Sequence, residues 1–594
     1  MRRLGRGLPW LVLLLAALAP LLVEGTYFRY LGIIVFIYGI VAVGLNVLAG
    51  YAGQFSLGHA ALMAMGAYST ALLSKALAPL PFFAATGLHI WLGIVLGTCV
   101  AAAFGALLAF PALRVRGPYL AMVTIAFGWV IFKILQEWVS VTGGDLGLAS
   151  IPKAQIGPWE LSTREYYYVV LAFFALSLVL QRRIVESPFG MRLRAMKHSE
   201  IGIASVGINV YRLKVTVFIV SAAFAGFGGA LFAHQQNYVS PDNFQFFSSV
   251  FFLLAILFGG AGTLSGPVIG ATVLTLLPEF LHDFDKYRLI VYGSFILLTL
   301  YFLPNGVMGM FRRPQGRATP KIDAESAQDT SRDMAASHGA SLELRAISRT
   351  FGGVAAVREA SFKIEAGAVH ALIGPNGAGK TTIINLITGF YRASSGEILL
   401  DGAPLNVSSM DGAARLGIAR TFQTIKLFGE MTVLEHVLVG VSSSSRAGIW
   451  SALLSGGRGG PKQNGDVATA RELIRCVGLG GYEEVPASTL AYGHRRLLEI
   501  ARALAVKPRV LLLDEPAAGL VAEEIAALGA VIRRLKNTGM TIVLVEHHMD
   551  LVIKVSDRIT VVDHGTVIAE GSPADVQRDA RVVAAYLGPS HVAA

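Results

Sequence analysis

The sequence predicts an α-helical membrane domain with about ten spans, followed by an α/β domain of the phosphate-loop type. Three observations support this fold class. The chain has 594 residues, which is more than a single hydrophobic core holds. Apolar runs of the length of a membrane span recur through residues 1–311. Residues 374–382 then match the phosphate-loop pattern, between a run typical of a buried strand and a run with helical spacing.

The whole net charge of +11 lies in the apolar half of the chain. Residues 1–320 contain 22 Lys and Arg and 11 Asp and Glu, which leaves 28 of each kind from the totals of 50 and 39. Lys and Arg are retained on the cytoplasmic side of membrane spans, so we expect membrane lipid as a partner. No nucleic acid is expected, because there is no basic stripe on a soluble domain. Two distant cysteines, Cys99 and Cys476, predict neither a disulfide framework nor a metal site.

The first apolar run, over residues 8–23, follows Arg2, Arg3 and Arg6. A cleaved signal peptide is the alternative, but no small-x-small cleavage site follows, so we expect an uncleaved span. The other runs lie near residues 31–48, 56–78, 90–113, 118–140, 166–180, 214–234, 249–278 and 288–303.

Region 249–278 is too long for one span and is interrupted by Gly259, Gly260 and Gly262. The chain must return to the cytoplasm before a nucleotide-binding domain, so the number of spans after residue 214 must be even. The runs 214–234 and 288–303 supply two, and this parity predicts two short spans over residues 249–278. Short glycine-broken spans are typical either of a substrate path or of close helix packing. Asn46, Gln54, Ser56 and His59 leave the same two alternatives open, a pathway lining or hydrogen bonds between helices.

The connection over residues 181–213 is strongly basic, which places it on the cytoplasmic side. Pro188 ends a helix, and a helix-forming stretch over about 189–205 precedes Gly207. Such a helix suits docking into a groove of an ATPase, and an ordinary basic loop is the alternative. After the spans, residues 312–340 have no periodic apolar pattern and are expected to form a flexible linker. The predicted domains are therefore 1–311, the linker 312–340, and 341–594.

The phosphate loop predicts a site for a nucleoside triphosphate with Mg²⁺. Its glycines let backbone N–H groups turn towards the phosphates, and the following helix presents its positive end to them. Lys380 would reach the β- and γ-phosphates, and Thr381 would hold Mg²⁺.

Further motifs in the soluble half fit the same chemistry. Strand-like residues 510–513 end at Asp514, suited to hold Mg²⁺ through water, and at Glu515, suited to polarise the attacking water. Another strand-like run, 541–545, is followed by His547, which is placed to contact the γ-phosphate. Phe351 is placed to stack on adenine, and Gln423 follows a third strand-like run. In this order the motifs predict a nucleoside triphosphatase.

The segment Leu490-Ala-Tyr-Gly-His494 resembles the signature of ATP-binding-cassette (ABC) ATPases. The resemblance implies ATP and Mg²⁺ as cofactors and two cassettes paired head to tail, each signature facing the partner's nucleotide. It implies catalytic roles for Glu515, for His547 as the switch histidine and for Gln423 as the coupling glutamine. The nucleotide-binding residues implied are Phe351, Gly374, Pro375, Asn376, Gly377, Ala378, Gly379, Lys380, Thr381, Thr382 and Gly493, and the Mg²⁺ ligands are Thr381, Asp514 and Gln423.

Other segments resemble, more narrowly, the importers of branched-chain amino acids. In the soluble half these are Gly389-Phe-Tyr391, Ile418-Ala-Arg-Thr-Phe-Gln423 and Ala517-Ala-Gly-Leu520. In the membrane half they are Gly44-Leu-Asn46, Gly50-Tyr-Ala-Gly-Gln54, Ser56-Leu-Gly-His-Ala60, Arg116-Gly-Pro-Tyr-Leu120, Gly207-Ile-Asn209 and Gly259-Gly-Ala-Gly262. Segment 187–207 would then be the family's coupling helix, and two subunits would be fused. Ala491, His494 and Val521 depart from the family pattern at the contact with the partner cassette.

By this resemblance we expect a second permease subunit, a second ABC ATPase subunit and an extracytoplasmic solute-binding protein as partners. The chain would be a multi-pass protein of the bacterial inner membrane with a cytoplasmic ATPase domain. The expected function is ATP-driven uptake of branched-chain or related hydrophobic amino acids. Alternatives are an importer of urea, amides or aromatic acids, a homodimeric exporter and a membrane-tethered regulatory ATPase.

Overall fold

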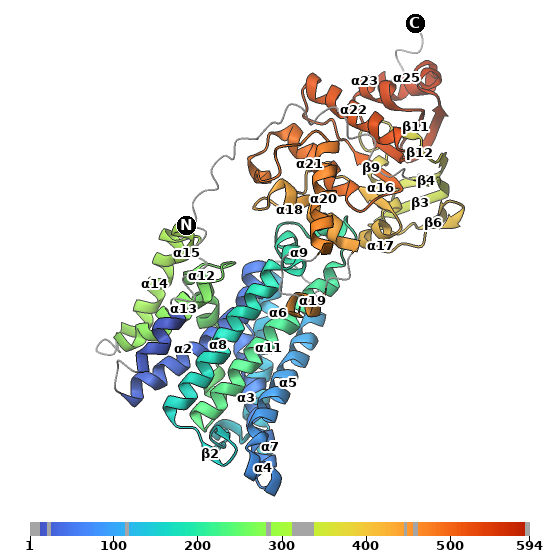
Figure 1. Ribbon diagram of the computed structural model, residues 1–594. Coiled ribbons are helices and arrows are strands. Elements are labelled where there is room, and N and C mark those ends of the chain that lie inside the picture. Colours follow the sequence, from blue (N-terminus) through green and yellow to red (C-terminus); the bar gives the residue numbers. More distant parts are fainter. Residues whose placement is uncertain are drawn as a thin grey trace. The chain divides into compact units, whose positions relative to one another are not determined.

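The computed structural model describes residues 12–20, 25–112, 118–280, 287–311, 338–444, 448–454 and 461–587. These residues form two compact units, which are described separately (Figure 1). The first unit consists of Met1–Lys197, Tyr211–Pro314 and Gly448–Gly457, and the second of His198–Val210, Gln315–Ala447 and Arg458–Ala594. Most of the predicted linker, residues 312–337, lies outside the described residues.

The first unit is helical, and each of the predicted apolar runs contains a helix. Its elements are α2 (Thr26–Leu45), η1 (Asn46–Tyr51), α3 (His59–Leu77), α4 (Pro81–Thr86), α5 (Leu88–Ala112), α6 (Pro118–Glu137), α7 (Val139–Thr142), η2 (Gly144–Leu146), β1 (Gln155–Ile156), β2 (Trp159–Glu160), α8 (Thr163–Glu186), α9 (Pro188–His198), α11 (Val210–Gln236), η3 (Pro241–Phe244), α12 (Phe246–Gly259), α13 (Gly266–Phe280), α14 (Arg288–Phe302), α15 (Val307–Met310) and α19 (Ile449–Leu454). Seven helical stretches among the described residues are long and apolar enough to cross a membrane. Residues 12–20 and the 15-residue helices α13 and α14 account for the three remaining predicted runs.

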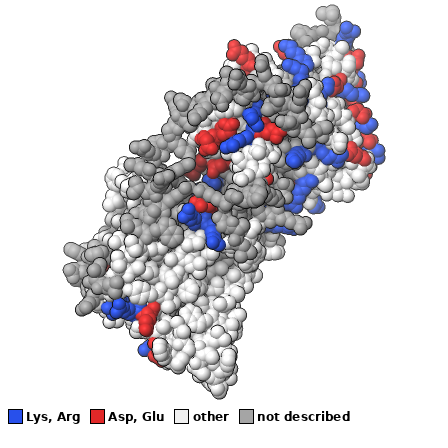
Figure 2. Space-filling model, viewed as in Figure 1, with Lys and Arg blue, Asp and Glu red and all other residues white. Residues whose placement is uncertain are grey.

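The surface of the first unit shown in Figure 2 is mainly uncharged. Large apolar side chains are exposed on its helices, as expected where lipid replaces water as the solvent. They include Leu107, Phe110, Met122, Trp129 and Ile134.

Region 249–278 consists of two helices, as parity predicts. Gly260 and Gly262 lie between α12 and α13 with φ values of 113° and 74°, which favour glycine. The Asn46 side chain satisfies the exposed backbone of this break: its Nδ2 donates to the Thr263 carbonyl at 2.8 Å, and its Oδ1 accepts from the Gly262 N–H at 2.8 Å. Asn46, at the junction of α2 and η1, therefore connects this junction to the break between α12 and α13.

His59 is also fully hydrogen-bonded inside the bundle. Its Nε2 lies 2.7 Å from Ser221 Oγ and its Nδ1 lies 3.2 Å from Ser56 Oγ. Ser221 Oγ in turn donates to the Gly44 carbonyl at 2.8 Å. Of the two roles predicted for these polar residues, the contacts support hydrogen bonding between helices.

The helix predicted over 189–205 is wrong in one respect, because two helices occupy this stretch. Ser199 leaves the helical region with φ −155° and ψ 105°, and its Oγ accepts a hydrogen bond from the Gly202 N–H at 2.9 Å. A serine in this geometry begins a new helix, α10 (Glu200–Ala204). The break also separates the two units, since α9 belongs to the first and α10 to the second.

Helix α19 comes from the soluble half of the sequence but belongs to the first unit. It packs against α8, where Arg183 Nη1 donates to the Leu453 carbonyl at 2.8 Å. The last turn of a helix has free carbonyls that a cation satisfies well. Each half of the sequence thus contributes one short segment to the compact unit of the other half.

The second unit is an α/β domain with two sheets. Its elements are α10, β3 (Leu342–Phe351), β4 (Val354–Ile364), β5 (Val369–Ile373), α16 (Lys380–Ile387), β6 (Ser395–Leu400), β7 (Ala403–Pro404), α17 (Met410–Arg415), β8 (Ile418–Arg420), α18 (Val433–Val441), η6 (Ser442–Ser444), α20 (Pro461–Cys476), η7 (Ala487–Thr489), α21 (Tyr492–Leu504), β9 (Val510–Asp514), α22 (Ala522–Asn537), β10 (Thr541–Val545), α23 (Met549–Val555), β11 (Arg558–Asp563), β12 (Thr566–Gly571), α24 (Pro573–Arg578) and α25 (Ala580–Leu587). The larger sheet has the strand order β12-β11-β5-β10-β9-β8, and the smaller antiparallel sheet has the order β4-β3-β6-β7.

Strands β5, β9 and β10 are buried along their whole length, as continuous apolar runs in a parallel sheet require. Strands β11, β5, β10, β9 and β8 are parallel neighbours. Their carboxyl ends therefore lie along the same edge of the sheet. Open α/β sheets bind ligands outside this edge.

Candidate functional site

The phosphate loop connects β5 with α16 and has a backbone that requires glycine. Gly374, Gly377 and Gly379 have φ values of 152°, 83° and 102°. A Cβ on Gly374 would collide with the Val562 carbonyl, and one on Gly379 with the Ala356 carbonyl. The loop therefore fits tightly between β11 and the β3–β4 hairpin. Glycine-rich loops at the start of a helix bind anions through their backbone N–H groups.

Lys380, the first residue of α16, is held against this loop. Its Nζ donates to the carbonyls of Gly374 at 2.7 Å and Pro375 at 2.8 Å, and the side chain is only 5% exposed. Burial lowers the pKa of Lys380, and the nearby carboxylates of Glu515 and Asp514 act in the opposite direction. The ammonium group is thus fixed where the motif predicts the phosphates.

The predicted catalytic residues meet at one carboxylate. Glu515 Oε2 accepts from Gln423 Nε2 at 2.8 Å, and Glu515 Oε1 lies 3.1 Å from His547 Nε2. These residues follow β9, β8 and β10, which are neighbours in the sheet. Glu515 has the left-handed φ of 46°, and its N–H donates to the Val545 carbonyl at 2.8 Å. Both carboxylate oxygens are thereby oriented by side chains from adjacent strands.

Asp514 has one carboxylate oxygen that suits a cation. Its Oδ2 accepts from Arg420 Nη2 at 2.8 Å, whereas the buried Oδ1 has no hydrogen-bond partner among the described residues. A buried carboxylate oxygen is rarely left unsatisfied, and a hard divalent cation takes such oxygen ligands. Thr381 lies in the first turn of α16, so the available oxygens fit Mg²⁺. Arg420 belongs to this arrangement although the motif pattern assigns it no role.

Phe351 is partly exposed at the end of β3. Its ring meets Tyr391 edge to face with centroids 4.9 Å apart, and the Arg349 guanidinium carbon lies 4.6 Å from its centroid. The motif pattern predicts neither Tyr391 nor Arg349. Arg349 and Phe351 are two residues apart on one strand, a spacing that places side chains on the same face and is the signal in the sequence.

Gly493, the glycine of the predicted signature, lies at the start of α21. The carboxylate of Glu524 occupies the place where a Cβ of Gly493 would be, and it also accepts from the Val521 N–H at 3.2 Å. Val521 is 63% exposed at the N-cap of α22 and has no side-chain acceptor to offer. The closest neighbour of Gly493 is thus on α22, whereas the phosphate loop borders β4 and β11.

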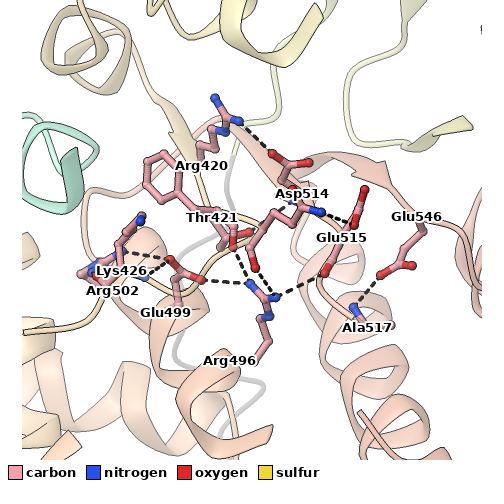
Figure 3. A network of polar contacts seen from close by, with 12 residues as sticks. Arg420, Thr421, Lys426, Arg496, Glu499, Arg502, Asp514, Glu515, Ala517 and Glu546 are labelled. Atoms are coloured by element: carbon pink, nitrogen blue, oxygen red, sulfur yellow. Dashed lines mark hydrogen bonds and ion pairs between the residues drawn. The ribbon is translucent and has the colours of Figure 1, made fainter. Parts of the chain in front are cut away.

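Three charged residues of α21 are fully buried next to the predicted catalytic residues, and no motif predicts them (Figure 3). They are Arg496, Glu499 and Arg502. Arg496 donates to the carbonyls of Phe422 at 2.6 Å, Gln423 at 3.0 Å and Glu515 at 3.3 Å. Their spacing of three residues puts them on one helix face, which is the signal in the sequence.

The predicted coupling segment, residues 187–207, is divided between the units: residues 187–197 belong to the first, and residues 198–210 belong to the second and contact it. Asn209 Nδ2 donates to Asp411 Oδ2 at 3.1 Å, and Arg415 Nε donates to the Gly207 carbonyl at 3.3 Å. Arg415 also pairs with Asp411 at 2.7 Å. These contacts join the segment to α17.

A second contact joins the same segment to the loop that follows Gln423. A Cβ on Gly202 would lie 3.1 Å from the Lys426 carbonyl and 3.3 Å from the Phe428 ring. A Cβ at this position would therefore make tight contacts, so a glycine suits the close approach of α10 to this loop. Residues 198–210 therefore lie between α17 and the loop that follows Gln423, the predicted coupling glutamine.

Three family models match the chain. Residues 28–300 match the branched-chain amino acid transport system permease component. Residues 357–518 match the ABC transporter model, and residues 566–588 match the branched-chain amino acid ATP-binding cassette transporter model. The two halves thus match separate components of one transport system.

Characterised relatives repeat this division. The first half is 36% identical to the high-affinity branched-chain amino acid transport permease protein LivM of Salmonella typhimurium, covering 47% of this chain and 69% of that protein. The second half is 41% identical to the ATP-binding protein LivG of the same organism and 39% identical to BraF of Pseudomonas aeruginosa, covering 42% of this chain and 97% of each. Among solved structures, the chain is similar to an ATP-binding cassette of an ABC transporter in its ADP conformation, with 32% identity and a TM-score of 0.38. The match covers 42% of this chain and 99% of that cassette. The chain therefore belongs to the branched-chain amino acid family of ABC transporters and joins the permease and the ATP-binding component of that family in one polypeptide.

Proposed function

We propose that the chain is the fused permease–ATPase subunit of an importer that uses ATP to take up branched-chain or related hydrophobic amino acids. One observation supports mechanical coupling between the two halves of the chain. Residues 198–210 of the membrane half form one compact unit with the ATP-binding half. The Gly202 contact places this segment against the loop of Gln423, whose side chain bonds Glu515. A change at the nucleotide therefore has a short physical route to the spans.

Different residues of the site bind the phosphates, contact the adenine, hold Mg²⁺ and activate the attacking water. The loop 374–379 and Lys380 bind the phosphates, and Phe351 supports the adenine ring. Mg²⁺ held by Thr381, Asp514 and Gln423 would neutralise phosphate charge. Glu515 orients the attacking water and accepts its proton, while His547 and Gln423 fix the carboxylate in place.

The proposed assembly contains two cassettes. Gly493 would face the nucleotide of the partner cassette, and Ala491, His494 and Val521 would alter that contact. The other proposed partners are a second permease subunit and an extracytoplasmic solute-binding protein. We place the chain in the bacterial inner membrane with its ATPase domain in the cytoplasm, in agreement with the basic connections between spans.

Uptake by reconstituted vesicles tests this function. The complex, purified with its co-purifying solute-binding protein, is expected to accumulate labelled leucine only with ATP. Urea, amides or aromatic acids as the accumulated solute would replace the proposed substrate, and ATP turnover without any solute flux would support a regulatory ATPase instead. The homodimeric exporter is disfavoured because relatives of both halves belong to branched-chain amino acid transport systems.

A further inference from the structure

Helix α21 carries a buried cluster of charges that links two parts of the site. Glu499 accepts hydrogen bonds at both carboxylate oxygens: Oε2 from Arg496 Nη1 at 3.2 Å, and Oε1 from Arg502 Nη2 at 3.3 Å. All three side chains are at most 1% exposed. Charged side chains are almost never buried to this degree unless they are paired, and here one carboxylate is paired with both guanidinium groups.

The first end of this cluster lies next to the catalytic carboxylate. Arg496 donates to the carbonyls of Phe422, Gln423 and Glu515 and so holds the backbone on both sides of the Gln423–Glu515 hydrogen bond. Figure 3 shows Arg496 pointing from α21 towards Glu515. A shift of Arg496 would therefore displace both residues.

The second end of the cluster lies beside the loop that contacts residues 198–210, which are called the coupling segment below. Arg502 donates to the Lys426 carbonyl, and its guanidinium carbon lies 5.3 Å from the centroid of the Phe428 ring. Glu499 Oε1 also accepts from the Lys426 N–H at 3.4 Å. The Lys426 carbonyl and the Phe428 ring are the groups that border Gly202.

We propose that Glu499 is a positioning residue that couples the Glu515 site to residues 198–210. It fixes the spacing between Arg496 and Arg502, so that backbone segments 422–423 and 426–428 move together with α21. The coupling segment then follows the loop, because Gly202 rests on it. This inference rests on the proposed function, in which closure of the cassettes drives the spans.

The inference is tested by hydrogen–deuterium exchange of the full chain, measured with and without Mg²⁺ and ATP. The unaltered protein is compared with Glu499→Gln, which keeps the shape of the side chain but removes its charge. In the unaltered protein, ATP is expected to change exchange at residues 374–382 and at 198–210. In Glu499→Gln, the change at 374–382 remains and the change at 198–210 is lost. We expect kcat to fall about tenfold while KM for ATP stays within about twofold, a split that mere loss of folded protein would not produce. Glu499→Asp, which keeps the charge, is expected to restore part of the response.

Glu570→Gln is the matched control, because Glu570 also pairs with an arginine, Arg558, at 3.2 Å but on β11–β12. It is expected to behave as the unaltered protein. An unchanged response at 198–210 in Glu499→Gln would overturn the inference, as would a response at 374–382 with none at 198–210 in the unaltered protein. If Glu499→Gln does not fold, Arg502→Lys provides the same comparison, since lysine cannot bond Glu499 and the Lys426 carbonyl together. No response at 374–382 in the unaltered protein would contradict ATP binding itself, which is a separate failure.

Discussion

Replacement of Glu515 by glutamine is expected to abolish ATP turnover and to leave ATP binding intact. Glutamine has the same shape and retains an oxygen that accepts from Gln423 or His547, but it cannot take a proton from water. General-base catalysis contributes roughly 10²–10⁴-fold, so kcat is expected to fall at least about 100-fold. Phosphate release measures turnover, and equilibrium dialysis with labelled ATP measures binding.

Glu570→Gln again serves as the control for the loss of one carboxylate. Turnover in Glu515→Gln that equals that of the unaltered complex would remove the catalytic assignment. Equal loss of binding and turnover would instead show that Glu515 supports the shape of the site, since the hydrogen bonds with Gln423 and His547 also hold two loops together.

Lys380→Ala is expected to weaken ATP binding by about tenfold to 150-fold, which corresponds to the roughly 1.5–3 kcal/mol of a hydrogen bond to a charged group. The ammonium group is buried and held by the Gly374 and Pro375 carbonyls, so no other cation of the loop replaces it. Dialysis with labelled ATP measures the change in dissociation constant.

Lys363→Ala is the matched control, because Lys363 on β4 forms an exposed ion pair with Glu365, just after the strand, at 3.0 Å. Exposed pairs of this kind contribute little, so ATP affinity is expected to stay within about twofold. An unchanged affinity in Lys380→Ala would mean that the phosphates lie elsewhere.

The cluster of predicted catalytic residues could be picked out from the sequence because each of its residues lies within three residues of the end of a strand. Gln423, Glu515 and His547 are far apart in the sequence, but parallel strands align their carboxyl ends, so local patterns were sufficient. Arg420 was not predictable in this way, because its partner Asp514 is 94 residues further along the chain. Arg349 was predictable only in part: its place beside Phe351 follows from their spacing on one strand, whereas its contact with the Tyr391 ring depends on packing between distant segments.

The buried charges of α21 show the same limit. Charged residues on a helix are usually solvated, and nothing within Arg496–Arg502 states that a loop covers that face. The break at Ser199 was missed for a local reason, since the flanking residues favour helix and one side-chain hydrogen bond to Gly202 decides the geometry. In the membrane half, Asn46 suited two roles until its partners at Gly262 and Thr263 were known.

In the proposed function, the ATP-binding half drives the spans through residues 198–210 of the same chain. The most direct test of this claim replaces residues 199–207 with a glycine–serine spacer and measures leucine uptake and ATP turnover together in proteoliposomes with the solute-binding protein. We expect uptake to be lost and ATP turnover to become independent of the binding protein. Uptake and stimulated turnover equal to those of the unaltered complex would contradict the claim.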